Sequence, residues 1–124
     1  MQKFFFYLLP AAFLLLTCCS KEGTGGKAAI NGKVLHHSTP IPGATVYIKY
    51  GAKESPGTNI PDYDSNVIAD SSAHYQFADL KAGDYYLFAV GFDSTTVQTV
   101  YGGIPVDIKS KAETVVSDVP VTED

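Results

Sequence analysis

The chain has 124 residues, which is enough for one domain with a single buried core. Its nine basic residues are all lysines, and thirteen acids outnumber them, for a net charge of −4. Nucleic-acid binding needs cationic patches and favours the bidentate guanidinium group of arginine, so this composition excludes a nucleic-acid partner.

The chain begins with a stretch typical of a secretory signal. Residues 1–3 are a short basic segment, and residues 4–16 are an apolar run that contains one proline. This run is too short to cross a bilayer as a helix, which takes about 20 residues. We therefore expect residues 1–18 to be a signal peptide that is removed from the mature protein.

Two adjacent cysteines follow the apolar run, in the stretch Leu16-Thr-Cys-Cys-Ser-Lys-Glu22. This stretch resembles a lipoprotein signal-peptidase site, with Cys19 as the acylated first residue of the mature chain. Cleavage one residue earlier, before Cys18, is the alternative. A lipid on Cys19 implies attachment to the outer membrane, at its periplasmic face or at the cell surface. Residues 19–26 are rich in glycine and are expected to be a flexible linker.

Alternating apolar residues predict the first strands of a domain that we expect to span residues 27–124. The first strand covers about 28–35, with Ile30 and Val34 facing the core. The second strand, 44–50, is expected to turn Val46, Ile48 and Tyr50 inward and Thr45, Tyr47 and Lys49 outward.

The longest irregular segment is 51–64. Loops of more than about 12 residues in a compact domain are more often functional or disordered than idle. Oxygen ligands for Ca²⁺ are offered by Asp62, Asp64 and Asp70, with Asn59 and Ser65. The spacing Asp62-Tyr-Asp64 is short enough, but it lacks the glycine and the closing glutamate of an EF-hand loop. We expect the three aspartates to be solvated loop acids.

The strand expected at 84–92 is apolar on both faces. It places Tyr85, Leu87 and Ala89 on one side and Tyr86, Phe88 and Val90 on the other. Such a strand is either covered twice or has one face that meets a partner.

The remaining pattern predicts an all-β domain. Further strands are expected at 65–69, 75–77 and 95–101, with Gly102-Gly103 as a turn. A last strand is expected to run from 104–108 into 114–121, with a break near Lys109. Seven short strands without helical periodicity after the signal are typical of an antiparallel sandwich.

A further pattern consists of Asp70, Tyr75, Phe77, Leu80, Gly83, Tyr85 and Leu87, with the stretches Ile30–Val34 and Thr39–Ile48 upstream. This pattern resembles a known family, the carboxypeptidase regulatory-like domain, which is a transthyretin-like β-sandwich module. The resemblance covers roughly residues 27–121, although His74 stands where the family usually has glycine. It implies a seven-stranded antiparallel Greek-key sandwich of the transthyretin (prealbumin) kind, here on a lipoprotein of the Bacteroidetes type.

No group of residues predicts an enzyme, a metal site or a cofactor. Adjacent residues on a strand point to opposite sides, so His36 and His37 are expected to diverge, and His74 lies on a turn. We therefore expect three exposed histidines. The transthyretin-like hydrolases use arginine and a C-terminal Tyr-Arg-Gly-Ser, whereas this chain has no arginine and ends in Val-Thr-Glu-Asp124.

Four aromatic residues form the candidate binding surface: Tyr47, Tyr63, Tyr86 and Phe88. Aromatic side chains anchor protein interfaces and stack on sugar rings. The alternative is that the long loop or the linker folds over them as a second small core.

Together these patterns predict a non-catalytic outer-membrane lipoprotein. It would be held to the membrane by its N-terminal lipid, and its sandwich would bind another envelope protein or serve in assembly. The alternative is a carbohydrate-binding module that presents exposed, coplanar aromatic residues to a glycan.

Overall fold

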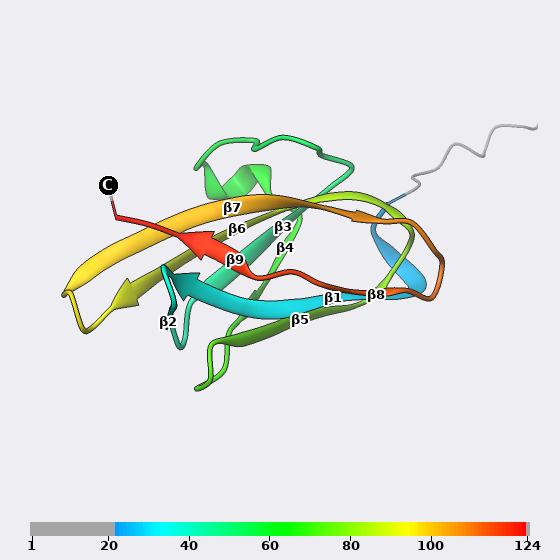
Figure 1. The fold of residues 1–124 in the computed structure, drawn as a ribbon. Coiled ribbons are helices and arrows are strands. Elements are labelled where there is room, and N and C mark those ends of the chain that lie inside the picture. The colour runs from blue at the N-terminus through cyan, green and yellow to red at the C-terminus, as the bar shows by residue number, and fades with distance from the viewer. Residues whose placement is uncertain (1–21, 124) are drawn as a thin grey trace, which may run out of the picture.

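The computed structural model of the chain describes residues 22–123. The signal peptide expected over 1–18 and the lipid expected on Cys19 lie outside these residues. The described part contains nine strands and a short 3-10 turn, η2 (Ile60–Asp62), and none of its helices is long and apolar enough to cross a membrane (Figure 1). The domain is therefore all-β, as the sequence predicts.

The first sheet is built around β1 (Thr24–His36), with β5 (His74–Leu80) antiparallel to it and β2 (Thr39–Pro40) in a hairpin at its end. Two short strands, β8 (Thr114–Val116) and β9 (Val119–Val121), pair with β1 in parallel. The expectation of a wholly antiparallel sandwich is wrong for these two pairs. They run parallel because the chain leaves the second sheet and returns alongside β1 in the same direction.

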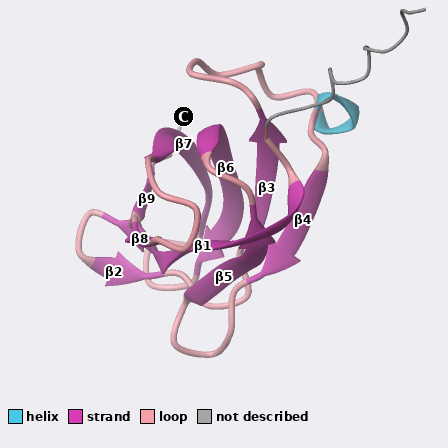
Figure 2. Ribbon diagram, turned by 90° about the vertical axis from the view of Figure 1, so that its right-hand side faces the viewer, coloured by secondary structure: helices cyan, strands magenta, loops and turns pink. Residues whose placement is uncertain are grey.

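The second sheet is antiparallel throughout. Its order is β4 (Ser65–Ile68), β3 (Thr45–Tyr50), β6 (Gly83–Asp93) and β7 (Gln98–Ile108). The two sheets lie face to face as two layers, in the manner of a β-sandwich (Figures 1 and 2). At one side they are joined, because Tyr101 of β7 and Thr122 exchange two backbone hydrogen bonds of 3.0 and 2.9 Å.

The core lies between the sheets and follows the predicted alternation. Tyr85, Leu87 and Ala89 of β6 are fully buried, and Tyr75 and Phe77 of β5 are buried on the facing layer. The other strands contribute Ile30 and Val34 from β1 and Val46 and Ile48 from β3, each 0% exposed, with Tyr50 packed against them at the margin.

The predicted turn at Gly102-Gly103 is wrong, because both glycines lie inside β7 and pair with Ala89 and Phe88. A Cβ atom at Gly102 would lie 2.2 Å from the carbonyl oxygen of Pro120, so glycine here permits close approach of β9. The chain instead reverses before Gln98, where Val97 adopts a positive φ of 56°. The expected strands at 95–101 and 104–108 are therefore one strand.

Candidate functional site

The outer face of the second sheet carries the predicted aromatic residues. The strand register places Tyr47 of β3 opposite Phe88 of β6, and Tyr86 one row further along, opposite Pro105. All three point away from the core, because they alternate with buried neighbours. Residues 51–64 cross over this face, drawn in green in Figure 1.

Tyr63 of the loop packs on two of these rings. Its ring centroid lies 5.7 Å from that of Phe88, with the planes 18° apart, and 5.9 Å from that of Tyr47. The Tyr47 and Phe88 centroids are 6.3 Å apart. Phe88 is consequently only 6% exposed. Burial also raises the pKa of the Tyr63 hydroxyl, which donates a 2.7 Å hydrogen bond to the carbonyl oxygen of Gly57.

The structure thus brings three of the four predicted residues together, but as a packed cluster. The loop folds over Tyr47 and Phe88 as a second small core, which is the alternative that the sequence left open. Tyr86 is not part of this cluster. It is half-buried, in the next cross-strand row, where it pairs with Pro105. The backbone amide of Asp64 donates to the carbonyl oxygen of Ile48 at 2.9 Å and fixes the end of the loop on β3.

Beyond this cluster, part of the outer face stays open. Ile68 is 69% exposed, Phe92 is 52% exposed and Ile60 is 39% exposed. Ile60 lines a mostly apolar hollow of about 390 Å³, together with Thr58 of the loop and with residues of β6 and β7. We call these residues the outer apolar patch: Ile60, Ile68, Val90, Phe92 and Tyr101.

The outer apolar patch is not among the surfaces that the sequence predicts. The sequence nevertheless contains a pattern that indicates the patch. The alternation along β6 places Val90 and Phe92 on the same face of the strand as Phe88. What the sequence did not reveal is which part of this face the loop covers.

The N-terminal end of the described chain is held against the start of β6. The hydroxyl of Tyr85 accepts a hydrogen bond from the amide of Gly23 at 2.9 Å and donates one to the carbonyl oxygen of Lys81 at 2.6 Å. The amide of Lys81 donates to the carbonyl oxygen of Gly23 at 2.8 Å. The flexible linker was expected to reach Gly26, but β1 already begins at Thr24.

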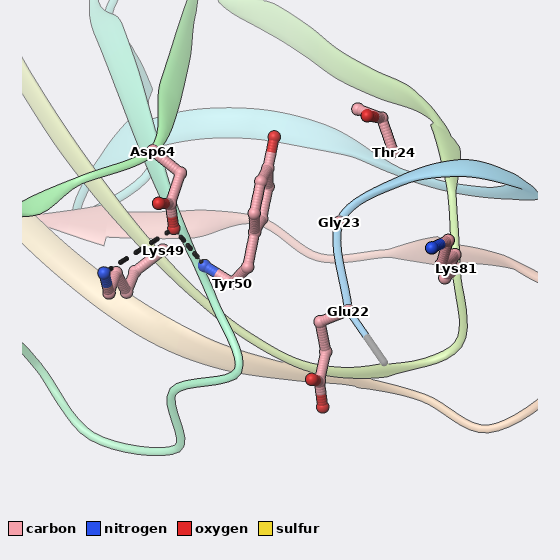
Figure 3. A pocket seen from close by; sticks show the side chains of 7 residues that line it. All are labelled: Glu22, Gly23, Thr24, Lys49, Tyr50, Asp64 and Lys81. Atoms are coloured by element: carbon pink, nitrogen blue, oxygen red, sulfur yellow. Dashed lines mark hydrogen bonds and ion pairs between the residues drawn. The ribbon is translucent and has the colours of Figure 1, made fainter. Parts of the chain in front are cut away.

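A polar hollow of about 370 Å³ opens beside this segment (Figure 3). One carboxylate oxygen of Asp64 accepts a 2.7 Å hydrogen bond from the amide of Tyr50 and lies 3.8 Å from the Lys49 ammonium group. Figure 3 shows Glu22 and Lys81 at the opposite side of the hollow. Asp64 is thus a structural acceptor that ties the loop to β3, rather than a purely solvated loop acid.

At the opposite end of the domain, His36 is buried between two carboxylates. Its Nδ1 lies 2.7 Å from Oδ2 of Asp93, and its Nε2 lies 2.5 Å from Oε1 of Glu123. His36 is 4% exposed and Asp93 is 2% exposed. The hydrogen bonds to Asp93 and then to Glu123 raise the pKa of the imidazole. The expectation that His36 is exposed is wrong.

The two adjacent histidines also come together instead of diverging. Their ring centroids are 4.6 Å apart. His37 follows the end of β1 and has a positive φ of 59°, so the strand alternation assumed from the sequence does not apply to it. His37 and His74 are exposed, as predicted.

No protein-family model matches the chain, and no curated protein matches it. A function is therefore inferred from the surfaces described above.

Proposed function

We propose that this chain is an outer-membrane lipoprotein, anchored through Cys19, whose sandwich is a non-catalytic protein-binding or assembly module of the cell envelope. We further propose that the sandwich is a carboxypeptidase regulatory-like domain with the Greek-key topology of transthyretin. The observation that carries the binding role is the outer apolar patch.

The outer apolar patch has the character of a protein-docking surface. Three of its large side chains, Ile60, Ile68 and Phe92, are between 39% and 69% exposed. Ile68 and Phe92 lie on the outer face of one sheet, and Ile60 lies on the loop that crosses it. Isolated exposed apolar residues, by contrast, are ordinary on protein surfaces. Phe88, which is stacked on Tyr63, lines the hollow next to Ile60, so this part of the surface is already ordered before binding.

The composition of the patch favours a protein over a glycan. A sugar ring stacks on the flat face of an exposed aromatic ring. Phe88 is covered by Tyr63, and both of these rings are engaged with Tyr47. The open part of the patch instead combines the aliphatic Ile60 and Ile68 with the ring of Phe92, which suits the apolar side chains of a protein partner.

The short connection to the proposed lipid supports a partner in the same envelope. Gly23 is hydrogen-bonded to Tyr85 and Lys81, and Glu22 lies only three residues after Cys19. Three residues span at most about 11 Å. An acylated Cys19 would therefore hold the domain close to the membrane surface, with the outer apolar patch on the side of the sandwich.

The docking role is tested by cross-linking in native outer membranes, followed by identification of the recovered proteins. The patch variant carries Ile68→Thr and Phe92→Thr, and the matched control is Val116→Thr. Val116 is 73% exposed but lies on β8 of the other sheet. We expect the same envelope protein to be recovered with wild type and control and lost with the patch variant.

Equal recovery with all three proteins would contradict docking at the patch. Failure to recover any protein, together with retention of the wild type on polysaccharide columns, would replace the proposal with glycan binding.

The anchor has its own test, which is metabolic labelling with a palmitate analogue. We expect Cys19→Ala to abolish labelling and to leave the precursor uncleaved. We expect Cys18→Ala to be labelled and cleaved like the wild type. Loss of labelling only in Cys18→Ala would move the acylated residue to Cys18.

A further inference from the structure

We propose that His36, His37 and Glu123 form a binding site for one divalent transition-metal ion of the zinc type, with Asp93 orienting His36. The site lies at the end of the sandwich away from the N-terminal segment, and it is independent of the outer apolar patch. One imidazole nitrogen from each histidine and one carboxylate oxygen of Glu123 all lie within 4.8 Å of one another.

The fold brings these residues together from distant parts of the sequence. His36 is the last residue of β1 and pairs with Val121 of β9, so Glu123 follows two residues beyond that pair. Asp93 is the last residue of β6. A convergence of strand ends from both sheets gives the site a rigid frame, because each of these strands is fixed by the core.

Asp93 sets the direction in which His36 can bind. Oδ1 of Asp93 accepts hydrogen bonds from the amide and the hydroxyl of Thr95, at 2.9 and 2.6 Å, which leaves Oδ2 to face Nδ1 of His36. When Nδ1 donates its proton to Asp93, the lone pair of Nε2 points toward Glu123. This carboxylate–histidine pairing is the arrangement that orients metal-binding histidines in proteins.

Charge balance favours a divalent cation at this position. Asp93 and Glu123 contribute two negative charges around an imidazole that is 4% exposed. A protonated His36 leaves the group with a net charge of −1. A divalent ion bound to neutral His36 makes the charge zero. An ion pair alone accounts for His36, Asp93 and Glu123, but it gives no role to the neighbouring ring of His37.

The ligand set defines the class of ion. Two imidazoles and one carboxylate are typical of zinc sites that keep a fourth position for water, whereas Ca²⁺ and Mg²⁺ prefer oxygen ligands. Nitrogen and oxygen ligands of tetrahedral zinc are about 3.4 Å apart. Nε2 of His36 and Oε1 of Glu123 are 2.5 Å apart, so binding requires Glu123, which is 39% exposed, to move outward by about 1 Å.

The test is isothermal titration of the full chain, purified without a polyhistidine tag and stripped with a chelator, using Zn²⁺ alone. The variants are His37→Ala and Glu123→Gln, which change side chains at the exposed rim of the site. The matched control is His74→Ala, since His74 is also exposed but lies on β5.

We expect one zinc ion per chain, with affinity lowered at least tenfold in His37→Ala and Glu123→Gln and unchanged in His74→Ala. Asp93→Asn, if it folds, should weaken binding by about 10- to 100-fold. Nitrogen NMR of His36 gives a second readout, because zinc leaves one ring nitrogen protonated whereas an imidazolium has both protonated. Wild-type affinity in both rim variants, or a doubly protonated His36 in the presence of zinc, would overturn the site.

Discussion

The two faces of β6 differ in what covers them. Its inner residues Tyr85, Leu87 and Ala89 are 0% exposed and lie in the core between the two sheets. Its outer residues face no second sheet in the described part of the chain. The loop residue Tyr63 and the neighbouring rings of Tyr47 and Tyr101 leave Phe88 6% exposed, whereas Phe92 is 52% exposed. A sheet covers its partner along the whole strand, whereas a loop covers what its few anchored side chains can reach. The outer face is therefore where the molecule can bind without losing its core.

The largest predicted effect is at the inner face. Leu87→Ala is expected to lower the free energy of unfolding by about 3 kcal/mol, because it leaves a cavity between two packed sheets. Val90→Ala, on the outer face of the same strand, should cost about 1 kcal/mol or less. Urea unfolding followed by circular dichroism measures both. Equal losses would show that the outer face is packed as firmly as the inner one.

Removing the loop side chain that covers the outer face is expected to lower the free energy of unfolding less than Leu87→Ala does. Tyr63→Ala should cost about 1–2 kcal/mol, because it removes the ring stacked on Phe88 and Tyr47. It should also speed amide hydrogen exchange in residues 51–64 while leaving that of β6 unchanged. Tyr63→Phe keeps the ring and removes the hydroxyl, with its hydrogen bond to Gly57, so it should retain most of the stability. Unchanged exchange in Tyr63→Ala would mean that the loop is held by other contacts.

A pH-dependent effect is expected at the inner face of the first sheet. Burial, and to a lesser degree the nearby Asp118, raises the pKa of the Tyr75 hydroxyl, which donates to the carbonyl oxygen of Ser117 at 2.5 Å. A raised folded-state pKa means that stability is complete below the unfolded pKa of about 10 and falls as the pH rises above it.

Tyr75→Phe should therefore flatten the alkaline loss of stability above about pH 10. At neutral pH it should cost about 1 kcal/mol, for the lost hydrogen bond. Urea midpoints between pH 7 and pH 11 measure this. An unchanged alkaline slope would show that Tyr75 ionises as readily in the folded chain as in the unfolded one.

The smallest predicted change in the free energy of unfolding is at the outer apolar patch. Phe92→Thr should change the free energy of unfolding by no more than about 0.5 kcal/mol, because the ring is half-exposed and threonine suits a strand. A thermal melt beside wild type measures it. A loss of about 2 kcal/mol or more would place Phe92 in the second small core instead of on a docking surface.

The alternation of apolar residues in the sequence predicted the core-facing residues correctly where one face of a strand is buried. The alternations around Tyr75 and Tyr85 correctly predicted which residues face the core. The same reasoning failed at Gly102-Gly103, because glycine signals either a turn or a close approach and only the neighbouring β9 distinguishes them. It also failed for the parallel pairing of β8 and β9, which depends on where the chain re-enters the first sheet.

The sequence by itself determined the all-β class, the inner and outer phases of the long strands and the apolar character of both faces of β6. These follow from residues that are neighbours in the chain, so a period of two reveals them. Only the tertiary structure decided that Tyr63 covers Phe88 and that His36 meets Asp93 and Glu123. His36 is 57 and 87 residues from these two carboxylates, and contacts over such separations leave no local pattern.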